Sequence, residues 1–195
     1  MRARWILVCV ALVLAGCSSD DDNPPDATTA TTEATTSTTA ATTSTTEFDG
    51  ATAPVTIPLD TAQTMLLTGV TVEHDEGVDR ITFEFRGEGV PLVDAQYVDE
   101  VRADGSGEPV EVEGTAYLSI RMEPASTADL SGEEVISTYT GPDRVRSDAT
   151  TAVTEVVRTG DFEANLTWVI GVRTNAEFRI SATPSPARVV VELAA

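Results

Sequence analysis

Apolar and polar residues alternate along most of the chain after residue 59, which is the pattern of strands with one buried face. In the clearest run, Ile81, Phe83 and Phe85 share one face, and polar residues lie between them. Three further runs alternate in the same way: 118–122, 164–170 and 189–193. Because each apolar face needs a second sheet to cover it, the pattern predicts an all-β fold, an antiparallel β-sandwich of two small sheets.

Clusters of Gly, Pro, Asp and Glu separate the alternating runs, as expected for turns between antiparallel strands. These clusters lie at 73–77, 87–89, 104–107, 141–143 and 159–161. Helix signals are weak, and the best candidates are residues 60–67 and 129–136. Residues 123–148 form the longest stretch without clear alternation, so we expect a binding surface there.

The amino terminus has the pattern of a secretion signal, in which two arginines precede an apolar run over residues 5–14. This run is about half the ~20 residues that cross a bilayer as a helix. It ends in Leu-Ala-Gly-Cys, which resembles the bacterial lipoprotein box that is cleaved between Gly16 and Cys17. We therefore predict a lipoprotein signal peptide over residues 1–16 and lipid attachment at Cys17. The alternative is an ordinary signal peptide, with Cys17 a simple thiol near the cleavage site.

Cysteine content supports the lipid interpretation. Cleavage would remove Cys9 and leave Cys17 without a partner, so no disulfide can form within the mature chain. Two or more acyl chains, such as palmitate, give a lasting anchor at about 0.8 kcal/mol per buried CH₂. We expect the protein to be anchored in the lipid bilayer on the extracytoplasmic face of the bacterial cell membrane.

Composition divides the rest of the chain into two parts. Residues 17–58 are rich in Thr, Ser, Ala and Asp and contain few side chains that a core could bury. Ordering them would cost backbone entropy with no hydrophobic return, so they are predicted to be a disordered tether. Residues 59–195 are long enough for one domain and short for two, and they are predicted to form a single folded domain.

The chain is strongly acidic, with a formal net charge of -20 and 32 acidic residues. Removal of the two arginines in the signal peptide leaves 10 arginines and no lysine in the mature chain. We do not expect nucleic acid as a partner, because no basic field is present to displace counterions from phosphates. The arginines provide planar groups suited to carboxylates, which peptidoglycan stem peptides carry.

Catalytic residues are scarce. The only histidine, His74, lies in an acidic, turn-like stretch, where a solvated side chain is the simplest interpretation. Ser106 lies between two glycines, but the G-x-S-x-G spacing and the following helix are absent. We therefore predict no catalytic residue, no cofactor and no metal. One alternative remains for calcium, which could be bound by a carboxylate cluster: Asp99, Glu100, Asp104 and Glu108.

Tyr139 is the aromatic residue that best fits a ligand-facing position, because it adjoins a turn and is followed by Arg144 and Arg146. These three residues are the candidate ligand-binding group. The alternative is that Tyr139 pins its loop to the sandwich. Trp168 shares a face with Leu166 and Ile170, so we assign it to the core.

The segment Gly-Val-Asp-Arg-Ile-Thr-Phe-Glu-Phe-Arg-Gly at 77–87 resembles the opening strand of AMIN and AMIN-like domains. Further matches to actinobacterial AMIN-like lipoproteins occur in the same order at 104–109, 138–142, 154–163, 166–171 and 187–193. The resemblance covers about residues 67–195. It implies an AMIN-like β-sandwich over residues 59–195, and it also implies targeting to peptidoglycan or the envelope. AMIN domains of cell-wall amidases and pilus secretins are attached to a catalytic or pore domain, and we expect no such domain within residues 1–195.

Together, these features predict a membrane-anchored envelope lipoprotein with a non-catalytic domain that binds peptidoglycan or another envelope component. Two alternatives remain. One is a protein–protein interaction or scaffolding module whose partner is an envelope protein. The other is a cell-wall hydrolase, which would need an acid or base with a shifted pKa in a cleft.

Overall fold

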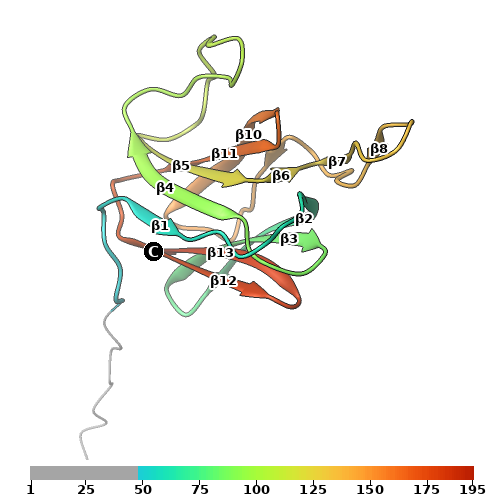
Figure 1. Ribbon diagram of the computed structural model, residues 1–195. Helices are drawn as coiled ribbons and strands as arrows, with labels where there is room; N and C mark the ends of the chain where they lie inside the picture. The colour runs from blue at the N-terminus through green and yellow to red at the C-terminus, as the bar shows by residue number, and fades with distance from the viewer. Residues whose placement is uncertain (1–47) are drawn as a thin grey trace, which may run out of the picture. The chain divides into compact units, whose positions relative to one another are not determined.

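Two stacked β-sheets form the body of the chain over residues 48–195, the part that the computed structural model describes (Figure 1). One sheet has six strands in the order β1-β4-β5-β11-β10-β9, and the other has five in the order β12-β13-β3-β2-β6. Every pairing in these sheets is antiparallel except β2 with β6. The predicted antiparallel β-sandwich is confirmed.

The strands of the six-stranded sheet are β1 (Val55–Ile57), β4 (Leu92–Val98), β5 (Ala116–Glu123), β11 (Asn165–Val172), β10 (Val153–Phe162) and β9 (Arg144–Val145). Those of the five-stranded sheet are β12 (Phe178–Pro184), β13 (Ala187–Ala194), β3 (Val78–Arg86), β2 (Met65–Asp75) and β6 (Ala125–Ser126). A separate hairpin, β7 (Ala128–Asp129) and β8 (Ile136–Ser137), extends away from the sandwich in Figure 1. The predicted signal peptide, the lipidation site Cys17 and most of the predicted tether lie outside the described residues.

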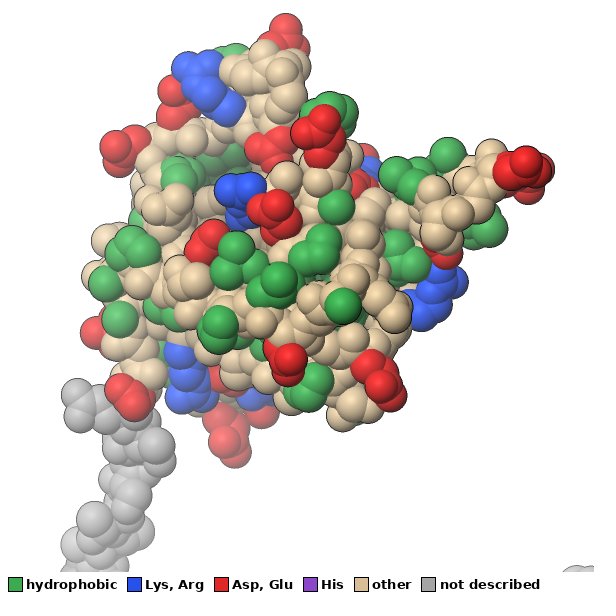
Figure 2. Space-filling model, in the orientation of Figure 1, with side chains coloured by type: hydrophobic (Ala, Val, Ile, Leu, Met, Phe, Trp, Pro, Cys, Tyr) green, Lys and Arg blue, Asp and Glu red, His purple; other side chains and the backbone are tan. Residues whose placement is uncertain are grey.

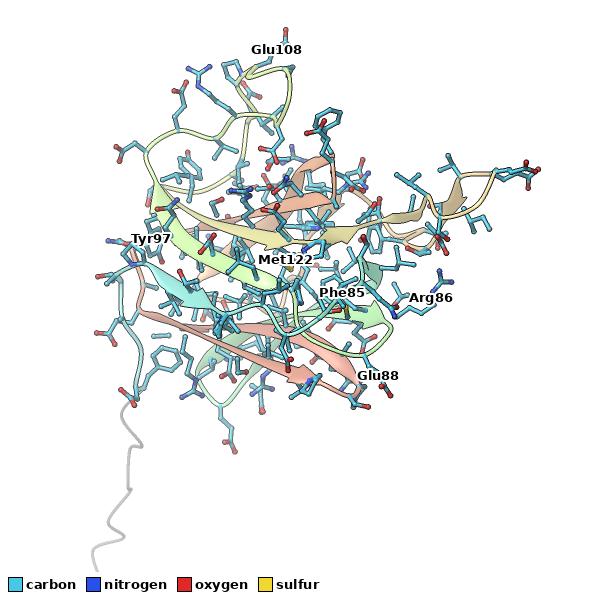
Figure 3. All side chains as sticks on the ribbon, viewed as in Figure 1. Phe85, Arg86, Glu88, Tyr97, Glu108 and Met122 are labelled. Carbon is cyan, nitrogen blue, oxygen red and sulfur yellow. The ribbon has the colours of Figure 1, made fainter. Side chains whose placement is uncertain are left out.

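The apolar faces of the alternating runs meet between the two sheets. Phe83 of β3 and Ile120 and Met122 of β5 are fully buried, and Figure 3 shows Met122 between the sheets. Trp168 of β11 is also fully buried, and its ring centroid lies 5.8 Å from that of Phe83. Burial of large aromatic side chains is a dominant stabilising contribution in a domain of this size.

The connection between β4 and β5, here called the 99–115 loop, folds over part of the outer face of the six-stranded sheet. Its residues Val101 and Val112 pack on Val157 of β10 and Val169 of β11, which face away from the main core. In Figure 1 the rest of the loop rises above β4 and β5. This second small core fixes the base of the loop, so the loop forms a wall beside the uncovered part of the sheet.

Neither of the two candidate helical segments, 60–67 and 129–136, forms a helix. In the first segment Met65 and Leu67 are buried and Leu66 is partly exposed, which is strand alternation, and the segment ends inside β2. In the second segment Val135 and Ile136 are largely exposed, so no packing is available to stabilise a short helix. Within residues 48–195, no helix is long and apolar enough to cross a bilayer.

Strand β1 precedes residue 59, where the composition predicts that the domain begins. It pairs with β4, and Ala51 exchanges two backbone hydrogen bonds of 3.0 and 2.9 Å with Phe178 of the other sheet. The sandwich therefore includes residues 51–58, which the sequence prediction assigns to the tether. The three-residue strand is too short for alternation to reveal it.

Candidate functional site

A polar groove of about 580 Å³ lies on the outer face of the six-stranded sheet. Its volume falls within the ~300–1,000 Å³ typical of small-ligand sites. Its floor comes from β4, β5 and β11, one side comes from β1, and the 99–115 loop contributes one wall residue. The lining residues are Pro54, Val55, Thr56, Asp94, Ala95, Gln96, Asp104, Ser119, Arg121, Phe162, Asn165 and Thr167.

The alternation that builds the core also builds the groove. Successive side chains of a strand point to opposite faces. On β5, Leu118, Ile120 and Met122 point into the core, so Ser119 and Arg121 point outward into the groove. Asp94 and Gln96 of β4, and Asn165 and Thr167 of β11, hold the corresponding outward positions on the neighbouring strands. Three adjacent strands thus present a continuous polar surface.

Asp104 ties the 99–115 loop to the sheet. Its Oδ2 accepts a hydrogen bond of 2.6 Å from the Thr167 hydroxyl, and its backbone N–H donates to the Thr159 carbonyl at 3.0 Å. The side chain lies directly over Gly160, where an added Cβ would be 1.9 Å from Oδ2. Glycine at position 160 is therefore required for Asp104 to reach the groove.

Several groove side chains are held in place by hydrogen bonds to one another or to Glu123 just outside the groove. The Thr56 hydroxyl donates to Asp94 Oδ1 at 2.8 Å. Arg121 donates from Nε to Asn165 Oδ1 at 2.8 Å and from Nη2 to Glu123 Oε2 at 2.7 Å. These contacts reduce the side-chain entropy that a ligand would otherwise have to freeze.

Other polar groups of the groove remain open to a ligand. Within residues 48–195, the side chains of Gln96 and Ser119 have no hydrogen-bonding partner, and Gln96 is exposed. The floor therefore offers both hydrogen-bond donors and hydrogen-bond acceptors, and the groove can bind hydroxyl and amide groups of a ligand.

Phe162 stands at the rim of the groove with 61% of its surface exposed. It is the last residue of β10 and precedes a tight turn in which Glu163 and Ala164 both have positive φ, 51° and 59°. Residues other than glycine rarely adopt this backbone conformation, which costs of order 1–3 kcal/mol per residue and is concentrated at functional sites. The hydrogen bond from the Ala125 N–H to the Ala164 carbonyl, 2.8 Å, helps to hold the turn.

Tyr139, a candidate ligand-binding residue, lies in the core and outside the groove. Its ring meets Trp168 edge to face at a centroid distance of 5.7 Å, and its hydroxyl donates to the Pro142 carbonyl at 2.9 Å. Burial raises the pKa of Tyr139, and the nearby Asp143 carboxylate adds to the increase. This geometry matches the alternative interpretation, in which Tyr139 pins its loop to the sandwich.

Arg144 and Arg146, the other two candidates, converge on the buried carboxylate of Glu155. Arg146 donates to Oε2 from Nε at 3.0 Å and from Nη2 at 2.8 Å, and Arg144 donates to Oε1 from Nη1. The Glu113 N–H also donates to Oε1, at 2.6 Å. Burial raises the pKa of Glu155, but the hydrogen bonds from Arg144, the Glu113 N–H and Arg146 outweigh it and leave the pKa below its ordinary value.

These two arginines border a second hollow of about 710 Å³, here called the arginine hollow. Four acidic residues besides Glu155 line it as well: Asp99, Glu100, Glu111 and Glu113. The pattern extends beyond this hollow, since nine of the ten arginines in residues 48–195 pair with carboxylates of the domain itself. The arginines are thus largely neutralised, and the remaining surface charge is acidic.

His74 and Ser106 also lie outside the groove. His74 Nδ1 is 2.6 Å from Oδ1 of the fully buried Asp79 on the five-stranded sheet. Asp79 also accepts backbone N–H bonds from residues 151–153, so it holds that loop in place. Ser106 lies in the turn of the 99–115 loop, where its hydroxyl accepts from the Glu108 N–H at 3.3 Å. Among the described residues, no group of three His, Cys, Asp or Glu side chains could hold a metal ion.

The sequence does contain a signal for the groove, although the candidate list does not include it. Polar residues occupy the outward positions of three strands, and an apolar residue, Phe162, follows Gly160 and Asp161. The predicted turn at 159–161 is wrong, because these residues lie inside β10, where Gly160 and Asp161 pair with β11, and the chain turns at Glu163 and Ala164. What alternation alone cannot give is the strand order, which brings β4, β5 and β11 side by side.

Comparison with known proteins identifies the family. A family model described as the AMIN-like domain matches residues 65–195, from β2 to the carboxyl terminus. No curated protein and no solved structure matches the chain. AMIN-like domains are generally non-catalytic binding modules associated with the cell envelope. Because the match covers well over half of the sequence, this chain belongs to the AMIN-like domain family.

Proposed function

We propose that the domain is a non-catalytic binding module that holds a polymer of the bacterial cell envelope, peptidoglycan in particular, in the groove of the six-stranded sheet. The observation that carries the proposal is the continuous polar floor formed by three adjacent strands, with an exposed aromatic ring at its rim. Open polar grooves suit a polymer because a long chain can pass through without its ends entering the site.

The second part of the proposal is anchoring. A lipid on Cys17 and a tether after it would keep the domain on the extracytoplasmic face of the membrane, within reach of the wall. Tethering replaces a search in three dimensions by a high effective concentration, so even weak binding in the groove is sufficient. The support is the Leu-Ala-Gly-Cys box at residues 14–17 and the Thr-rich composition that follows it.

The test is sedimentation with purified peptidoglycan sacculi. A soluble Cys17→Ser form without residues 1–16 is mixed with sacculi in the presence and absence of calcium, and we expect it to pellet. The Ser119→Trp substitution should fill the groove floor and leave the protein in the supernatant. Ser181→Trp, which places the same ring on the exposed face of β12 in the other sheet, is the matched control and should pellet normally. A protein that stays in the supernatant under all conditions would contradict the proposal.

The β7–β8 hairpin favours a second candidate function, docking to an envelope protein. Leu130, Val135 and Ile136 on this hairpin are 66%, 72% and 58% exposed. Figure 2 shows hydrophobic side chains along the projecting arm and acidic ones at its tip. Exposed apolar groups gathered on one projection mark interaction sites more often than single exposed residues do. Replacing all three with serine should abolish crosslinking to a defined partner and leave sedimentation with sacculi unchanged.

A further inference from the structure

We propose that the groove recognises a neutral, hydroxyl-rich sugar chain, and that it rejects anionic ligands such as the carboxylate-bearing stem peptides. This inference rests on the proposed function and specifies which chemical part of an envelope polymer the site would bind. Three features of the groove support it: its charge, its hydrogen-bonding groups and its exposed aromatic ring.

The charge of the groove disfavours anions. Two carboxylates, Asp94 and Asp104, line it, and its one cation is Arg121. That guanidinium already pairs with Glu123 outside the groove and with Asn165 inside it. An anionic ligand would therefore meet two like charges and no uncommitted cation, which is unfavourable in a partly desolvated site. The carboxylates of a stem peptide would therefore find no free arginine among the residues that line the groove.

The hydrogen-bonding groups of the groove match hydroxyl groups on adjacent carbons. Asp94 uses Oδ1 to accept from Thr56, and Asp104 uses Oδ2 to accept from Thr167. Each carboxylate can accept further hydrogen bonds at its other oxygen, because a carboxylate has about four lone-pair sites. Gln96 adds a planar amide with both a donor and an acceptor. Planar side chains of this kind can bind two neighbouring hydroxyl groups at once.

Phe162 supplies the apolar contact that a sugar also needs. A pyranose ring has an apolar C–H face, and burying that face against an aromatic ring removes apolar area from water. The Phe162 ring is 61% exposed at the groove rim, and the strained Glu163–Ala164 turn follows directly after it. A ring held in the open beside polar groups is the arrangement that a polar ligand with one apolar face requires.

The experiment is an amide NMR titration of the soluble Cys17→Ser chain with three probes: a chitin hexasaccharide, a cellulose hexasaccharide and an acidic stem peptide. We expect the chitin oligomer to shift amide signals of β4, β5 and β11, and the stem peptide to shift none at equal concentration. Equal binding of the cellulose oligomer would also support a neutral-chain site and would identify the source as a glycan without acetamido groups. Binding of the peptide in the groove, or no shift with either oligosaccharide, would overturn the inference.

Substitutions make the titration specific. Phe162→Ala should lower the affinity for the chitin oligomer about tenfold, and Gln96→Ala should lower it by a smaller factor. Ile136→Ala is the matched control, because Ile136 is similarly exposed, 58%, but lies on the β7–β8 hairpin. Unchanged affinity in Phe162→Ala would overturn the assignment. If oligosaccharides fail to bind while sacculi still retain the wild-type protein, the sugar assignment fails and the proposed function survives.

Discussion

The groove and the arginine hollow lie on the same sheet and use similar residues in opposite ways. In the arginine hollow, Arg144 and Arg146 both bind the buried carboxylate of Glu155, and the three side chains form a structural ion-pair cluster. In the groove, the ion pair of Arg121 lies at the edge, and polar groups such as Gln96 remain open. Residue types suited to a ligand therefore mark a site only when the fold leaves them without internal partners.

The largest expected effect comes from removing the buried charge of the arginine hollow. Glu155→Gln removes the buried carboxylate that Arg144 and Arg146 share and leaves Arg146 only its 3.4 Å contact with the exposed Glu113. Loss of one partner of a buried ion pair typically costs about 3–5 kcal/mol. Because the arginine side chains are 42% and 57% exposed, we expect about 2–3 kcal/mol in urea unfolding. Sedimentation with sacculi should remain unchanged for the folded variant. The exposed Glu113→Gln is the control and should cost under about 0.5 kcal/mol.

The next largest effect should come from Gly160→Ala, which acts on the groove. The added Cβ would overlap the Asp104 side chain and push the 99–115 loop away from the sheet. We expect a loss of about 1–3 kcal/mol in stability together with weaker retention on sacculi. Gly105→Ala is the control in the same loop: its positive φ of 81° should make alanine cost about 1 kcal/mol in stability, but nothing lies within 4 Å of the added Cβ, so retention should be unchanged. If Gly160→Ala and the wild type are retained equally on sacculi, the 99–115 loop does not contribute to binding.

Acid should affect the arginine hollow through Glu155. A carboxyl group whose pKa is lower in the folded state than its ordinary value of 4.5 stabilises the fold above that value. That stabilisation is lost as the pH falls below about 4.5 and toward the folded-state pKa. Unfolding curves measured across this range should show a smaller pH dependence in Glu155→Gln than in the wild type. An identical slope in the two proteins would show that other carboxylates control acid unfolding.

The smallest effect should be a gain in stability at the groove rim. Ala164→Gly removes the penalty of a left-handed residue after Phe162 and should stabilise the domain by up to about 1 kcal/mol in thermal unfolding. Glycine at the same position would also let the Phe162 ring move more freely, so we expect a slightly lower affinity for sacculi. A loss of stability would mean that the turn is not strained.

Alternation predicted the fold class because the strands have a period of two and their apolar faces need covering. Ile81, Phe83 and Phe85 are buried as that pattern requires. Alternation could not predict the order of the strands in each sheet. The groove depends on that order, since β11 lies beside β5 although more than 40 residues of sequence separate them. Tyr139 and its neighbouring arginines have the composition of a site, but only the pairing partners revealed by the fold show where their polar groups go.

The Ala51–Phe178 pairing has a mechanical consequence. In a domain anchored to the membrane and bound to the wall, tension would enter at the amino-terminal end, which leads into β1 at the side of the groove. The two backbone hydrogen bonds between Ala51 and Phe178 join that entry point to the five-stranded sheet before the chain reaches β1. Under such a load, part of the force would pass to the opposite layer of the sandwich, and the strands of the groove would keep their register under a pull that would otherwise separate β1 from β4.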